Sequence, residues 1–218
     1  MIQPLRYLLS FFREEVLEVS SSAYNTRLEV WYAWGKHVVN AANVNLSFGS
    51  LDKVFREAFR QIHLPKKPWK DVLLLGLGAG NVPAILDELP GPYHTTGVEI
   101  DGEMIRLAEK WCGLRQRNNL QVVQADAISF AKTCPQRFDL VIIDLFVDSL
   151  VPGEAEQGEF LSQCANLLRP GGMLMFNRLM HTSDLAEQSQ KFTRRMQEIL
   201  PGTRYITAHT NRMLLYEK

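Results

Sequence analysis

Three alternating glycines occupy one short segment, in which Gly76, Gly78 and Gly80 lead to Asn81. Glycine permits tight turning and close approach of the main chain to a ligand, and a helix that follows presents free N–H groups to that ligand. We therefore interpret the segment as a binding site for a nucleotide-type ligand rather than as a purely structural turn. It departs from the dinucleotide fingerprint G-x-G-x-x-G, because Asn81 stands where that motif has its last glycine.

Acidic residues end or follow the next apolar runs along the chain. Glu99 ends one run, Asp144 ends the most hydrophobic run, and Asp126 and Ala127 follow the run between them. In an open α/β sheet, ligands bind outside the carboxyl ends of the strands, where an acid can accept hydrogen bonds from both ribose hydroxyls. We expect Glu99 to hold a ribose and Asp144 to project into the central cleft as a functional carboxylate. For Asp101 we favour a helix N-cap, whereas for Asp126 a cap and a contact with a purine amino group stay equally open.

Alternating strand and helix patterns position these residues. Strands are expected at residues 72–75, 95–99, 120–124, 140–144 and 173–177, and helical patterns begin near Asn81, Gly102, Ala127 and Glu154. The strands are short and continuously apolar, which is typical of a parallel sheet covered by helices on both faces. A helix over about 184–200 precedes strands at 205–208 and 212–216, whose short connection requires them to be antiparallel. We therefore expect a doubly wound, mostly parallel seven-stranded α/β sheet, Rossmann-like, with its last strand antiparallel.

The first part of the chain has a different pattern. Residues 15–45 are rich in Val, Trp, Tyr and Thr and are interrupted by Gly35 and Lys36, which indicates a β-ribbon. Residues 50–63 show the apolar spacing of a helix with one buried face. We expect residues 1–50 to form an N-terminal helix and β-ribbon extension, and residues 51–218 to form the α/β domain. The apolar ribbon outside the main sheet leaves a homodimer as a hypothesis.

Length and composition limit the functional classes. The 218 residues are 46% hydrophobic and 22% charged, which fits a single globular domain with a small accessory piece. Basic and acidic residues number 24 each, so no positive excess favours nucleic acid. Neither the cysteines nor the histidines have metal-site spacing, so we expect no metal and no disulfide framework. The apolar runs are too short to cross a bilayer and residues 1–19 do not read as a secretory signal, so no membrane association and a cytoplasmic location are expected.

Five short motifs follow one another in order along the chain: the glycine segment at 76–80, Val-Glu-Ile-Asp at 98–101, Ala-Asp-Ala at 125–127, Asp-Leu-Val-Ile-Ile-Asp at 139–144 and Arg-Pro-Gly-Gly at 169–172. This order resembles the class I S-adenosylmethionine-dependent methyltransferases. The ribbon, the segment 45–50 and the spacing of Glu99 and Asp144 are similar to the spermidine synthase family. The resemblance implies that Glu99 holds the cofactor's ribose, that Asp126 and Ala127 lie by its adenine, and that the glycine turn passes beneath its amino-acid tail. It also implies that Asp144 takes a proton from an attacking amine.

The chain departs from the spermidine synthase pattern around the substrate. That family has an aspartate at the position of Asn81, which favours the ammonium-ended decarboxylated S-adenosylmethionine and disfavours ordinary S-adenosylmethionine by charge repulsion. Asn81 removes this discrimination. Phe48 and Gly49 replace a Tyr-Gln pair that contacts the polyamine, and Asp148 is displaced by one residue from the second acid of the family's gatekeeping loop. Phe48 and Asp148 are therefore candidate substrate residues, although an exposed loop acid is the favoured interpretation of Asp148.

The expected function is transfer of the methyl group of S-adenosylmethionine to a small amine acceptor. An amine has an unperturbed pKa near about 10, so a proton must leave before attack, and Asp144 is the best-placed base. The first alternative is aminopropyl transfer from the decarboxylated cofactor to a putrescine-like diamine. A non-catalytic adenosine-ligand-binding protein is the second alternative, and a dinucleotide-dependent oxidoreductase is the third.

Overall fold

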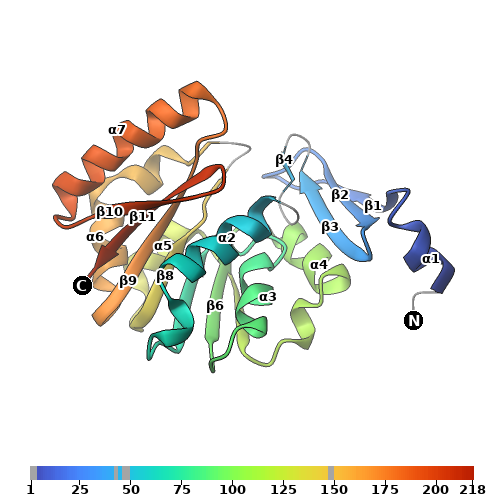
Figure 1. Ribbon diagram of the computed structural model, residues 1–218, viewed down its shortest axis with the longest axis horizontal. Coiled ribbons are helices and arrows are strands. Elements are labelled where there is room, and N and C mark those ends of the chain that lie inside the picture. Colours follow the sequence, from blue (N-terminus) through green and yellow to red (C-terminus); the bar gives the residue numbers. More distant parts are fainter. Residues whose placement is uncertain (1–3, 42–43, 46–49, 147–149) are drawn as a thin grey trace.

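The computed structural model describes residues 4–41, 44–45, 50–146 and 150–218, and its centre is a seven-stranded sheet (Figure 1). The strands of this sheet are β5 Asp71–Leu75, β6 His94–Glu99, β7 Leu120–Gln124, β8 Phe138–Ile143, β9 Leu168–Leu179, β10 Arg204–Ala208 and β11 Asn211–Glu217. They lie in the order β10-β11-β9-β8-β5-β6-β7. The strands from β5 to β9 pair in parallel, whereas β11 runs antiparallel to both β9 and β10. The expected Rossmann-like sheet with a reversed last strand is confirmed.

Helices cover both faces of this sheet. The helices are α2 Ser50–Gln61, α3 Asn81–Glu88, α4 Gly102–Trp111, α5 Ala127–Thr133, α6 Gly158–Asn166 and α7 Ser183–Ile199. Alternate residues of each strand point to opposite faces, so Val72 and Leu74 pack with α2, α3 and α4. Leu73 and Leu75 pack with α5, α6 and α7 on the other face. Because both faces are covered, the central strands are continuously apolar, as the sequence indicated.

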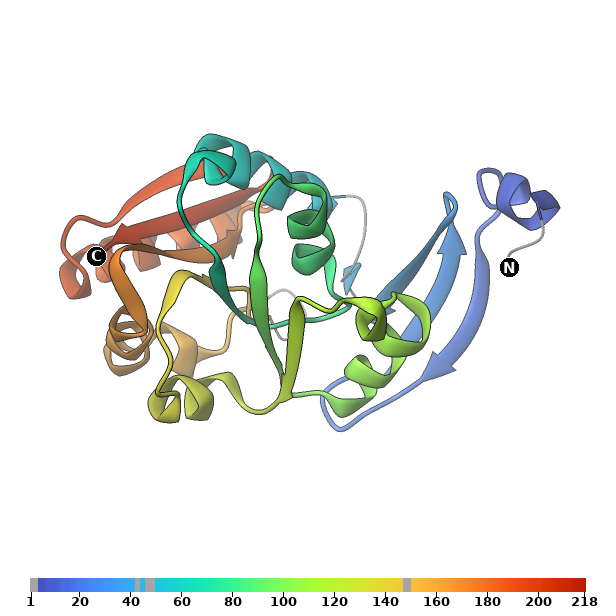
Figure 2. The same ribbon diagram turned by 90° about the horizontal axis from the view of Figure 1, so that it is seen from below.

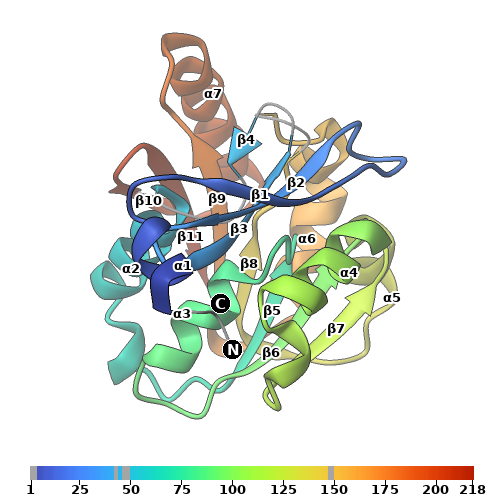
Figure 3. The same ribbon diagram turned by 90° about the vertical axis from the view of Figure 1, so that its right-hand side faces the viewer.

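The N-terminal ribbon lies outside the main sheet, next to α4 (Figures 2 and 3). It comprises α1 Pro4–Leu9 and the antiparallel strands β1 Glu15–Ser20, β2 Leu28–Ala33, β3 Lys36–Ala41 and β4 Val44–Asn45. The turn between β2 and β3 has φ of 53° at Trp34 and 72° at Gly35. Two successive positive φ values are the geometry of a two-residue hairpin turn whose twist matches the flanking strands. The expected ribbon and its break at Gly35 are therefore confirmed.

The ribbon is held to α4 by a small apolar cluster and by charged hydrogen bonds. Leu28, Val30 and Val39 pack with Ala79, Met104 and Leu107. Glu18 accepts hydrogen bonds from Lys110, Arg106 and Trp111, which lower its pKa to about 2. These contacts join the ribbon to the main sheet, and the division of the chain after residue 50 stays a prediction.

Two expected elements have displaced boundaries. The strand expected at 173–177 is longer, because β9 spans Leu168–Leu179. A helix was expected to begin near Glu154, but Gly153–Glu156 forms a short 3-10 turn, η3, and α6 begins at Gly158. The backbone of Gln157 is extended, with ψ of 145°, and this separates the two segments. Two further 3-10 turns are η1 Leu64–Lys66 and η2 Leu114–Gln116. In the described part of the chain, no helix combines the length and the apolarity needed to cross a bilayer.

Candidate active site

A cavity of about 650 Å³ lies at the carboxyl ends of the central strands. It is lined by most of the residues that the sequence singled out, namely Gly76, Gly78, Asn81, Glu99, Asp126, Ala127 and Asp144. We call it the carboxyl-end cavity. Gly80 does not line it, because Gly80 caps the start of α3 and faces Leu114. Phe48, Gly49 and Asp148 lie outside the described residues.

Strand alternation explains why polar groups gather in this cavity. On β8, Leu140 and Ile142 point to the face covered by α2, so the next residue on that face is Asp144. On β9, Met173 and Met175 point to the same face, and the next residue in that row is Asn177. Each row therefore changes from apolar to polar at its carboxyl end, where the helices no longer cover it.

The glycine turn leaves open space beneath the cavity. Gly76 has φ of 93°, and a Cβ on it would lie 2.2 Å from the carbonyl oxygen of Asp144, so a larger residue cannot take its place. Gly78 has φ of 52°, and a Cβ on it would have no neighbour within 4 Å. The turn therefore provides a place where a ligand can approach the main chain closely.

Glu99 supports the glycine turn and keeps acceptor capacity for a ligand. One carboxylate oxygen accepts from the N–H of Gly78 at 2.8 Å, and the other accepts from the N–H of Asp101 at 3.0 Å. Burial raises the pKa of Glu99, while these N–H donors oppose the increase. A carboxylate offers about four lone-pair sites, so each oxygen can still accept from a ribose hydroxyl.

Asp101 caps α4 and also ties the β1–β2 loop to the cavity. One of its oxygens accepts from the main-chain N–H groups of Glu103 and Met104, which confirms the expected N-cap. The other oxygen accepts from Ser22 Oγ at 2.6 Å and from Asn25 Nδ2 at 2.7 Å. Since Asn25 lines the carboxyl-end cavity, the N-terminal ribbon contributes to its wall.

Asp126 caps α5 and lines the cavity at the same time. Its Oδ1 accepts from the N–H of Ser129 at 2.8 Å. The cap that the sequence left open is therefore present, and the side chain still borders the cavity with Ala127.

Asp144 combines burial with one specific hydrogen bond. Burial, together with the negative charge of Glu99, raises the pKa of Asp144 from 3.8 to about 6, while a hydrogen bond from Asn177 opposes the rise. That bond joins Asn177 Nδ2 to Asp144 Oδ1 at 2.8 Å. Asp144 is therefore a carboxylate that can exchange a proton near neutral pH.

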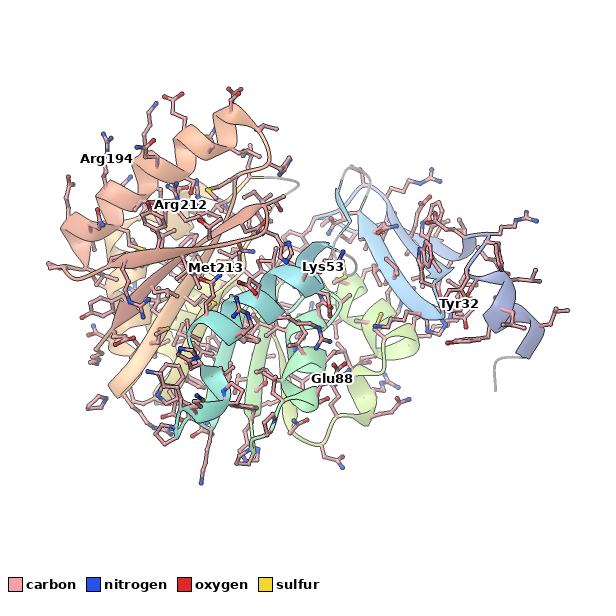
Figure 4. The ribbon with its side chains drawn as sticks, viewed as in Figure 1. Tyr32, Lys53, Glu88, Arg194, Arg212 and Met213 are labelled. Carbon is pink, nitrogen blue, oxygen red and sulfur yellow. The ribbon has the colours of Figure 1, made fainter. Side chains whose placement is uncertain are left out.

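Two buried asparagines behind Asp144 were not identified from the sequence. Asn177 and Asn211 both line the cavity, and Asn211 Nδ2 donates to Asn177 Oδ1 at 2.7 Å. Figure 4 shows the alternation that places Asn211, with Met213 on the α2 side of β11 and Arg212 on the α7 side. Asn211 shares the side of Met213 because the two residues are two positions apart. Asn177 follows Met173 and Met175 on the same face of β9, so the alternation in the sequence could have indicated it. To recognise Asn211 one must also know that β11 pairs with β9.

Asn81 begins α3 at the wall of the carboxyl-end cavity. Its Nδ2 is buried and has no hydrogen-bond partner. A buried amide donor normally has a partner, because leaving it unpaired costs about 1–3 kcal/mol. The positive end of the α3 helix adds to the preference for an anionic group at this place.

The remaining polar side chains of the cavity are acidic or neutral. Glu154 from η3 and His181 from the segment after β9 both line it, and neither was expected there. No Lys or Arg is among the described residues that line the cavity. In the described ranges, no group of three or more His, Cys, Asp or Glu side chains is arranged to hold a metal ion.

The glycine turn, the acids and the helix start lie within the segment that matches a protein-family model. This model, described as "Methyltransferase domain", matches residues 72–172. A polyamine aminopropyltransferase of Vibrio vulnificus is 32% identical over 109 residues, which cover 49% of this chain and 36% of that protein. The chain spans about a third of the length of the first curated relatives that it matches.

Solved structures show the same fold. A spermidine synthase in complex with the transition state analogue AdoDATO has a TM-score of 0.73 and 19% identity, with 92% of this chain and 73% of that chain covered. Human methyltransferase-like protein 13 in complex with SAH has a TM-score of 0.60 and 20% identity, with 77% of this chain and 78% of that chain covered. The chain shares the fold of these two solved structures, and its residues 72–172 match the methyltransferase-domain model.

Proposed function

We propose that the chain binds S-adenosylmethionine in the carboxyl-end cavity and transfers its methyl group to a small cationic amine. The observation that carries the proposal is the neutral side chain of Asn81, which begins α3 in the wall of this cavity. An amide donor at a helix N-terminus suits the carboxylate of the amino-acid tail, which the decarboxylated cofactor lacks. An aspartate at this position would repel that carboxylate.

The other lining residues fit the rest of the cofactor. Glu99 has a free acceptor site on each oxygen for the ribose hydroxyls, and Asp126 and Ala127 would border the adenine. Gly78, beside which a Cβ would have no neighbour within 4 Å, leaves room for the tail to pass along the turn. When bound, the cofactor supplies an electrophilic methyl carbon on a sulfonium.

Asp144 is the proposed base for the acceptor. An amine reaches the cavity as a cation, and an acidic lining without a described Lys or Arg attracts it. Because the pKa of Asp144 is about 6, this group is mostly ionised at pH 7 and takes the proton that the amine must lose. The freed nitrogen lone pair then forms the bond to carbon, and the electrons of the breaking carbon–sulfur bond pass to sulfur.

Calorimetry with the two forms of the cofactor tests the role of Asn81. Wild type is expected to bind S-adenosylmethionine more tightly than its decarboxylated form. The Asn81→Asp variant is expected to weaken binding of S-adenosylmethionine by about 10- to 100-fold, the range for losing a hydrogen bond to a charged group, and to reverse the preference.

A matched variant separates this effect from a general change of charge. Asn118→Asp adds the same charge at an exposed position that lines a different cavity, shared with residues of the amino ends of β5 and β6. It is expected to leave both affinities unchanged. A wild-type chain that prefers the decarboxylated cofactor would overturn the argument from Asn81.

Aminopropyl transfer is the second candidate function. The acidic lining of the cavity suits a diamine, and curated relatives are named polyamine aminopropyltransferases. Incubation with putrescine and each cofactor, followed by mass spectrometry of the products, distinguishes the addition of a methyl group from that of an aminopropyl group. Binding of cofactor without turnover across a broad panel of amines would support the non-catalytic alternative instead.

A further inference from the structure

A row of hydrogen-bonded side chains leads from β11 across β9 to Asp144. Asn211 Nδ2 donates to Asn177 Oδ1 at 2.7 Å, and Asn177 Nδ2 donates to Asp144 Oδ1 at 2.8 Å. We propose that Asn177 and Asn211 are positioning residues, which hold Asp144 in one orientation and keep it ionised while its second oxygen faces the acceptor. This role rests on the proposed function, in which Asp144 is the base.

Asn177 and Asn211 are buried polar side chains in rows of the sheet that are otherwise apolar. Asn177 is 0% exposed and Asn211 is 2% exposed. Their neighbours in the same rows, Met175 and Met213, are apolar and pack in the core. Since a pair of buried polar groups can often be replaced by apolar groups at little cost in stability, folding alone does not require two amides here. Their shared end point at Asp144 indicates a role in the cavity.

The direction of the hydrogen bonds fixes which atom meets Asp144. An ionised Asp144 only accepts, so Asn177 presents its nitrogen to it and its oxygen to Asn211 Nδ2. Thr210 Oγ1 donates to the free Asn211 Oδ1 at 3.0 Å. A reversed amide would place two oxygens or two NH₂ groups against each other. Asn211 therefore acts on Asp144 through Asn177.

The surroundings of Asp144 make the hydrogen bond from Asn177 important for keeping the carboxylate ionised. Burial and the charge of Glu99 both favour the protonated form, and the hydrogen bond from Asn177 favours the ionised form. The other titratable side chains lining the cavity are Tyr24, Asp126, Glu154 and His181. Among the described residues, Asn177 is the one side chain that donates a hydrogen bond to the carboxylate of Asp144.

Titration of the Asp144 carboxyl carbon by ¹³C NMR tests the proposal without requiring turnover. The signal is assigned with Asp144→Asn. In Asn177→Leu the midpoint is expected to rise by at least about one pH unit, a tenfold change in proton affinity. In Asn211→Leu it should rise by less, because the donor remains but its orientation is no longer fixed. Thr210→Val, at an exposed position at the far end of the row, should give the smallest rise.

A control removes a buried hydrogen bond elsewhere. Thr203 is 5% exposed and donates to the carbonyl of Leu200 at 2.6 Å. Thr203→Val is expected to lower stability and to leave the Asp144 midpoint where it is in wild type. If Asn177→Leu does not fold, Asn211→Leu and Thr210→Val still decide the question.

Two outcomes separate this proposal from the proposed function. Unchanged Asp144 midpoints in the Asn177 and Asn211 variants overturn the positioning role, whether or not the chain turns over a substrate. If the variants raise the Asp144 midpoint but the chain transfers no group to any amine, the positioning role of Asn177 and Asn211 is supported and the proposed transferase function is not. Where turnover is found, the acidic limb of the kcat profile is expected to move with the NMR midpoint, while cofactor affinity stays the same.

Discussion

Replacing Asp144 by asparagine is expected to stabilise the folded chain, although it removes the proposed base. The pKa of Asp144 rises from 3.8 to about 6 in the fold, because burial and Glu99 disfavour the charge. This difference corresponds to about 3 kcal/mol of stability lost when the group is ionised. The amide side chain of the Asp144→Asn variant has nearly the same shape as the carboxylate, and its oxygen can still accept from Asn177 Nδ2.

The expected gain depends on pH in a defined direction. Between the unfolded value of 3.8 and the folded value of about 6, the folded chain binds the proton more tightly, so stability falls as pH rises. Above the folded pKa the full penalty remains. The free energy of unfolding of Asp144→Asn should therefore exceed that of wild type by about 3 kcal/mol at pH 8 and by only about 1 kcal/mol at pH 4.5.

Urea denaturation of both proteins at the two pH values measures these differences. Asp184→Asn removes an exposed carboxylate in the first turn of α7 and should change the free energy of unfolding by less than about 1 kcal/mol at either pH. If Asp144→Asn is no more stable than wild type at pH 8, or if its gain is the same at both pH values, the carboxylate does not carry the energetic penalty that its burial implies.

Three further substitutions test two residues of the cavity and the loop that Asp101 holds beside it. Glu99→Gln leaves one acceptor oxygen for two main-chain N–H groups, so the free energy of unfolding should fall by about 1–3 kcal/mol and calorimetry should show weaker cofactor binding. Gly76→Ala forces a Cβ against the carbonyl of Asp144, and thermal unfolding is expected to show a lower Tm. Asp101→Ala removes a helix cap worth about 1 kcal/mol and frees the β1–β2 loop, which hydrogen exchange should detect as lost protection in the ribbon.

Local patterns in the sequence predicted most of the fold. Short apolar runs between helical patterns located β5, β6 and β7 to within a residue at each end, because burial on both faces leaves a distinct signature. The brief connection before β11 predicted its reversed direction. The start of α6 was misplaced, because η3 and α6 have continuous helical character in sequence and the extended Gln157 between them has no strong signal.

The site was predictable only where its residues follow a strand or turn directly. Glu99, Asp126 and Asp144 end or follow strands, and the structure brings all three to one cavity. Asn177 was missed although it continues the apolar row of β9, whereas the contact of Asn211 with Asn177 depends on the pairing of β9 with β11, which joins distant parts of the chain. The tie between Asp101 and the β1–β2 loop likewise depends on how the ribbon docks on α4.

A crystal structure of the chain soaked with S-adenosylmethionine tests the central claim most directly. The account predicts electron density for one adenosyl group in the carboxyl-end cavity, with the ribose on Glu99, the sulfonium facing Asp144 and the carboxylate tail within hydrogen-bond distance of Asn81. Density for the molecule elsewhere on the chain, or an empty cavity at saturating ligand, would contradict it.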